Sequence, residues 1–147
     1  MITKAKNLSF QLLSGLVVVL AVAGCASTNV ITDTAAPVPA DRIYATALSE
    51  ATPGTVPVVF KRDTFPGHYY LMSVFVDGKQ VARIGSGEKL VVNLAPGRYV
   101  FGVAATSVDK APDREIAVTV TEQYHPILRL SLVAVGWGGW KITEASQ

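Results

Sequence analysis

From residue 42 to residue 135, short runs rich in Val, Ile, Leu, Tyr and Phe are interrupted by Gly, Pro, Asp and Asn. Turn residues at intervals of about 8–12 positions indicate β-strands joined by tight turns. The runs predict strands at 42–48, 56–62, 70–76, 79–85, 89–95, 98–105, 114–121 and 126–135. No window keeps the apolar stripe of an amphipathic helix. The sequence therefore predicts an all-β fold, an antiparallel β-sandwich of seven to eight strands.

Alternation along two of these runs predicts which side chains face the core. Ile116, Val118 and Val120 share one face, and Leu128, Leu130 and Leu132 share another, with Arg129 and Ser131 on the opposite side. Asp77-Gly78 between apolar runs favours a type I′ hairpin, although a four-residue loop over 77–80 fits as well. The long apolar run 126–135 would also suit an open edge strand that pairs with a partner or with a second copy.

The first 24 residues have the three parts of an export signal. Lys4 and Lys6 form a basic start, residues 8–23 carry no charge, and small residues close the segment. The uncharged part is short for a membrane-spanning helix, which needs about 20 predominantly apolar residues. We therefore expect this segment to be removed.

Cys25, the single cysteine, directly follows this segment. Val22-Ala23-Gly24-Cys25 resembles a bacterial lipobox, in which the cysteine carries a diacylglycerol and begins the mature chain. The resemblance implies lipidation of Cys25 and, because Ala26 follows instead of aspartate, an outer-membrane location facing the periplasm. Two or three acyl chains would make such an anchor effectively permanent.

These features divide the chain into a lipoprotein signal peptide (1–24), a lipidated cysteine with a flexible linker (25–40) and a β-sandwich domain (41–147). The linker is predicted flexible because it is composed mainly of small, polar and proline residues. Removing the signal leaves 11 basic and 11 acidic residues. A neutral domain without a basic cluster argues against nucleic acid as a partner.

Residues 74–103 resemble PEGA-like domains, with a strand, an Asp-Gly-Lys turn, further strands and a Pro-Gly before an aromatic-bearing strand. The segment Pro39-Ala40-Asp41-Arg42-Ile43-Tyr44 and the glycine-rich stretch 136–142 resemble bacterial lipoprotein domains of unknown function. The resemblance implies a transthyretin-like or Ig-like sandwich with a final short strand. It implies no activity.

A search for catalytic chemistry identifies no catalytic residues, metal ligands or cofactor site. His68 and His125 lie in predicted turns without an activated nucleophile, and two histidines make no zinc cluster. Gly85-Ser86-Gly87 precedes a strand pattern rather than the helix that a phosphate loop requires, which favours a β-turn. We therefore expect a protein that is not an enzyme.

Aromatic side chains beside glycines are the remaining candidates for a site. Tyr69, Tyr70, Trp137 and Trp140 would suit a partner-binding surface, and the two tryptophans would equally suit the end of the core. We expect an outer-membrane-anchored, non-enzymatic lipoprotein that serves as a structural or protein-binding module of the envelope. Its partners would be the membrane, through the lipid, and an envelope protein. The alternative is a periplasmic carrier of a small apolar or glycan ligand held between the sheets.

Overall fold

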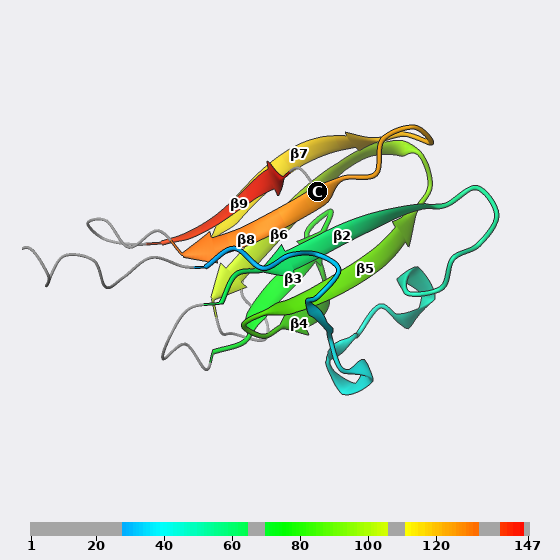
Figure 1. Ribbon diagram of the computed structural model, residues 1–147. Helices are drawn as coiled ribbons and strands as arrows, with labels where there is room; N and C mark the ends of the chain where they lie inside the picture. Colours follow the sequence, from blue (N-terminus) through cyan, green and yellow to red (C-terminus); the bar gives the residue numbers. More distant parts are fainter. Residues whose placement is uncertain (1–27, 65–69, 106–110, 133–138, 146–147) are drawn as a thin grey trace, which may run out of the picture.

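Nine strands and two short 3₁₀ helices make up the fold in the residues that the computed structural model describes, 28–64, 70–105, 111–132 and 139–145 (Figure 1). The strands are β1 (Ala36–Pro37), β2 (Val56–Arg62), β3 (Met72–Val76), β4 (Lys79–Ile84), β5 (Glu88–Leu94), β6 (Gly97–Ala105), β7 (Arg114–Val120), β8 (Ile127–Leu132) and β9 (Trp140–Ala145). The helices are η1 (Ala40–Arg42) and η2 (Thr46–Leu48). The all-β prediction is confirmed.

The strands form two sheets, one with the order β1-β5-β2-β8-β9 and one with the order β4-β3-β6-β7. The four-stranded sheet is antiparallel, as predicted. The five-stranded sheet is mixed, because β1 runs parallel to β5 and β2 runs parallel to β8. The prediction of a wholly antiparallel sandwich is therefore wrong for this sheet. No hairpin joins β2 to β8: the chain passes through the other sheet between them, and such a crossover permits parallel pairing.

Seven of the eight expected strands are confirmed, and their described ends differ from the expected ones by at most two residues. Residues 133–135 of the last run lie outside the described residues. The strand expected at 42–48 is wrong: Ile43 forms a single bridge to Ala82, and η1 and η2 lie on either side. The amides of Tyr44 and Ala45 both donate to the carbonyl of Val81, which does not continue a ladder. With β1 and β9 added, the count exceeds the predicted seven to eight.

The described part of the segment that precedes η1 packs against the five-stranded sheet. Thr28 pairs with Thr64, β1 pairs with β5, and the side chains of Ala35 and Val38 are buried. The expected flexible linker over 25–40 is therefore corrected for residues 28–38, since small apolar side chains in this segment find a sheet to pack on. Residues 25–27 lie outside the described residues.

The core lies between the two sheets and follows the period-two pattern. Phe60 of β2 meets Phe101 of β6 edge to face, with ring centroids 5.5 Å apart, and both side chains are fully buried. The predicted inward faces are confirmed for Val118, Val120, Leu128 and Leu130, with Ile116 packed at the margin. Side chains from both sheets fill this interior.

Two local alternatives are decided by the backbone. Asp77 and Gly78 both have positive φ, 47° and 74°, and Val76 pairs with Lys79, so the connection is a two-residue type I′ turn. The suggestion of an open edge at 126–135 is wrong for β8, because this strand lies between β2 and β9.

Candidate functional site

The N-terminal segment, residues 28–38, crosses the outer face of the five-stranded sheet beside β2 and β8 (Figure 1). At one end, Thr28 and Thr64 exchange backbone hydrogen bonds of 2.9 and 3.1 Å. At the other end, β1 pairs with β5. Between them, Lys89 Nζ donates to the carbonyl of Thr32 at 3.0 Å. The segment is therefore held at three places and arches over the sheet.

A groove of about 470 Å³ lies beneath this arch. Its floor comes from the face of β2 that is opposite the core, because floor residues alternate with the buried Val58 and Phe60. The floor consists of Pro57, Val59 and Lys61 of β2 and Ile127 of β8, and the walls of Asn29, Ile31, Thr32, Asp33 and His125. The groove therefore combines an apolar floor with a few polar groups, as small-molecule sites do.

Lys61 is the unusual residue of the groove. Only 3% of this residue is exposed, and its ammonium has no ion pair or hydrogen bond within the described part of the chain. Thr32 Oγ1 is also buried without a hydrogen-bond partner. His125 and Asp33 are exposed at the walls, and His125 Nε2 lies 3.2 Å from the carbonyl oxygen of Glu122. Among the described residues, the groove thus holds one ammonium without an ion pair and one buried hydroxyl without a hydrogen-bond partner.

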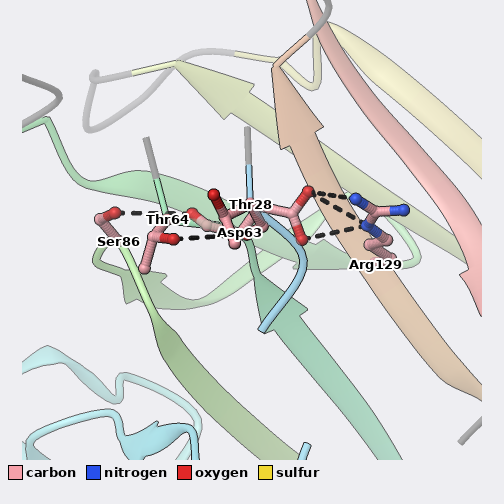
Figure 2. A network of polar contacts seen from close by, with 5 residues as sticks. All are labelled: Thr28, Asp63, Thr64, Ser86 and Arg129. Carbon is pink, nitrogen blue, oxygen red and sulfur yellow. Dashed lines mark hydrogen bonds and ion pairs between the residues drawn. The ribbon is translucent and has the colours of Figure 1, made fainter. Parts of the chain in front are cut away.

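A polar clamp fixes the sheet where the arch begins (Figure 2). Arg129 of β8 holds the Asp63 carboxylate with two nitrogens: Nη2 lies 2.7 Å from Oδ2, and Nε lies 3.0 Å from Oδ1. The Asp63 side chain is 2% exposed and that of Arg129 is 33% exposed. The hydrogen bond to Asp63 is the main reason that the pKa of Arg129 is raised, with burial acting against it.

The same clamp joins two further segments. Ser86 Oγ donates to the Asp63 carbonyl at 3.5 Å, and Thr64 Oγ1 donates to the Thr28 carbonyl at 3.3 Å (Figure 2). Together with the Asp63–Arg129 pair, these contacts connect the N-terminal segment, β2, β8 and the turn before β5. The geometry of the groove is therefore tied to the sheet.

Two of the four aromatic candidates from the sequence are brought together by Arg62. Its Nη1 donates to the carbonyls of Tyr70 and Ile84, at 2.5 and 2.9 Å, and its guanidinium carbon lies 4.8 Å from the centroid of the Trp140 ring. Trp140 is half-buried against the core, and Tyr70 is 61% exposed. Trp140 therefore helps to close the end of the core, whereas Tyr70 contacts Arg62 through its backbone carbonyl and exposes its side chain. Tyr69, Trp137 and Cys25 lie outside the described residues.

Arg62 carries a charge into the interior. It is 1% exposed, and its Nε and Nη2 are buried without hydrogen-bond partners. Burial lowers the pKa of Arg62 from its ordinary value to about 10, with the charge of Glu88 acting against it. Below about pH 10, the Arg62 guanidinium is charged in both the folded and the unfolded protein, so its burial lowers the free energy of unfolding at neutral pH. This cost decreases only above about pH 10, where the folded protein begins to release the proton.

Lys61, Arg62, Asp63 and Thr32 were not among the candidates from the sequence. The one available signal was the charged run Lys61-Arg62-Asp63 at the end of an apolar strand, which is atypical for a buried strand. Within the described residues, no group of three or more His, Cys, Asp or Glu side chains is placed to hold a metal ion. No helix among them has the length and apolarity needed to cross a membrane.

Comparisons of the chain with protein-family models, with curated proteins and with solved structures find no match.

Proposed function

We propose that this protein is a lipid-anchored, non-enzymatic module of the bacterial cell envelope, attached to the outer membrane through Cys25 and facing the periplasm. Its β-sandwich would serve as a structural or protein-binding part. The resemblance to PEGA-like domains contributes only an expected β-sandwich architecture to this proposal, and no activity. The observation that carries the proposal is the docking of the N-terminal segment: the chain joins the sandwich at Thr28, three residues after the lipobox cysteine.

The short connection determines how an anchored domain would sit. Three residues span at most about 11 Å even when fully extended. An acyl chain on Cys25 would therefore hold the end of the sandwich that carries Thr28, Thr64 and Ser86 close to the headgroups. A domain on a long flexible tether would have no preferred orientation, whereas this one would present a constant end to the periplasm.

The end directed away from the membrane would be the partner-facing one. It carries the Asp77-Gly78 hairpin and a second hollow of about 560 Å³, whose lining includes Tyr44, Leu48, Asn93 and Tyr99. Tyr44 is half exposed, and exposed tyrosines are enriched in protein interfaces. This surface supports a protein-binding role over a purely structural one.

The intact mass of the processed polypeptide tests the anchor. We expect a species that begins at Cys25 and carries the added mass of a diacylglycerol with or without a further acyl chain. We also expect that species in outer-membrane fractions. A chain that begins at another residue, or that begins at Cys25 without acyl mass, would contradict the proposal.

Site-specific labels test the orientation. A fluorophore on Ser86→Cys marks the end near Thr28, and one on Lys79→Cys marks the hairpin end. The two exposed positions are separated along β4 by roughly 20 Å, at about 3.3 Å per residue. In vesicles with a quencher on the lipid headgroup, we expect the label at position 86 to be quenched more strongly than the label at position 79.

The matched control is the same pair of labels on a Cys25→Ala chain, for which we expect no quenching at either position. Equal quenching of both labels on a chain whose acyl mass has been verified would contradict the fixed orientation while leaving the anchor intact.

One specific observation favours the alternative function, a carrier of a small ligand. Side chains fill the space between the sheets, which argues against a ligand held there. The groove beneath the N-terminal segment lies outside that space and is open to small molecules.

A further inference from the structure

The groove is lined by a lysine whose charge is not neutralised by any of the residues that the structure describes. Lys61 is 3% exposed, with Val59 and Ile127 beside it on the floor, and its ammonium has no ion pair within the described residues. Its ammonium nitrogen remains accessible to water, which an anion in the groove can replace by forming a charge-assisted hydrogen bond. The groove is therefore prepared to accept a negative charge.

A second donor lines the same groove. Thr32 Oγ1 is buried and has no hydrogen-bond partner, although a threonine hydroxyl can donate one hydrogen bond. The position of Thr32 is set by Lys89, whose Nζ holds its carbonyl at 3.0 Å. An ammonium and a hydroxyl along one groove match the two oxygens of a carboxylate.

The remaining lining limits the ligand further. Asp33 is the one acidic residue among the described lining residues, and it lies exposed on the N-terminal segment. Lys61 and Asp33 carry formal charges of opposite sign, so Lys61 attracts one carboxylate while Asp33 repels a second negative charge on the ligand. Ile31, Val59 and Ile127 offer apolar surface for an aliphatic tail. A volume of about 470 Å³ is within the range for small-molecule sites.

We propose that the groove binds a small monocarboxylate with a short aliphatic tail. The carboxylate accepts hydrogen bonds from Lys61 and Thr32, and the tail lies on Val59 and Ile127 under Ile31. This inference is independent of the lipid anchor and of the protein-binding role, because the ligand site is on the face of the sheet and needs neither.

Hexanoate and 1-hexanol, which share a chain length and differ in charge, are the probes. The processed protein, purified as the cell makes it, is titrated with each at neutral pH by calorimetry. Hexanoate is expected to saturate one site, and hexanol to bind at least about tenfold more weakly, because a charged hydrogen bond is lost. Absence of saturable hexanoate binding, or equal affinity for hexanol, overturns the proposal.

Variants locate the site. Lys61→Met keeps an unbranched side chain and removes the charge, and Lys141→Met makes the same change at an exposed position on the outer face of β9. We expect Lys61→Met to weaken hexanoate binding at least about tenfold without lowering Tm, because the substitution breaks no ion pair or hydrogen bond of the described residues. Lys141→Met should bind as the parent protein does. Parental affinity of Lys61→Met overturns the proposal.

Thr32→Val is a second test of the binding site, and its result does not depend on whether Lys61→Met folds. The substitution preserves the shape of the side chain and removes the hydroxyl on a surface segment. We expect hexanoate affinity to fall several-fold with Tm unchanged. Unchanged affinity overturns the proposed role of Thr32 and, with it, the assignment of the carboxylate to this groove.

Discussion

Replacing Phe60 with alanine is expected to lower the free energy of unfolding by about 3–5 kcal/mol, the usual cost of truncating a fully buried aromatic side chain. Phe60 is inaccessible to solvent and its ring meets Phe101 of the opposite sheet. The substitution removes a contact that joins the two sheets and leaves a cavity between them. Because domains are stable by only about 5–15 kcal/mol, this single change would remove a large part of the total.

Urea unfolding followed by circular dichroism measures this loss, and Tm should fall by roughly 10–25 °C. The control is Val91→Ala on β5, whose side chain is 38% exposed on the outer face of the same sheet. We expect that variant to stay within about 1 kcal/mol of the parent. If both variants lost the same free energy, Phe60 would not be the contact that holds the sheets together.

Replacing Asp63 with alanine is expected to lower the free energy of unfolding by about 2–3 kcal/mol, less than the roughly 3–5 kcal/mol for breaking a fully buried ion pair. The carboxylate is almost fully buried and accepts three hydrogen bonds from Arg129. Its removal leaves the guanidinium without that partner. The loss is moderated because a third of the Arg129 side chain is exposed and water can replace part of the interaction.

Glu144→Gln provides the control for Asp63→Ala. Glu144 is exposed and accepts a hydrogen bond from Tyr124, so we expect a change within about 0.5 kcal/mol. The single variant Arg129→Met and the double variant Asp63→Ala/Arg129→Met complete a double-mutant cycle. The double variant should lose clearly less free energy of unfolding than the sum of the two single losses. Additive losses, or a loss for Glu144→Gln as large as that for Asp63→Ala, would contradict the assigned strength of the clamp.

The contrast between Lys61 and Arg62 shows how much of the candidate site could be predicted from the sequence. Period-two alternation places these neighbours on opposite faces of β2, so one points toward the core side and the other toward the outer face. The alternation does not reveal that residues 29–33 cover the outer face, because that segment reads as a linker of small and polar residues. Trp140 was a candidate on composition, but its contact with Arg62 required the tertiary structure.

The sequence by itself determined seven strands, the inward face of each alternating run, and the composition of the Asp77-Gly78 turn, because all of these depend on residues close together in the chain. Only the tertiary structure decided that β2 runs parallel to β8, that residues 28–38 dock on the sheet, and that Asp63 meets Arg129 across 66 positions of sequence. Alternation specifies which face of a strand is apolar, but it does not determine which other strand lies beside it in the sheet. That choice is made when two sheets pack together, and the groove exists only as a consequence of it.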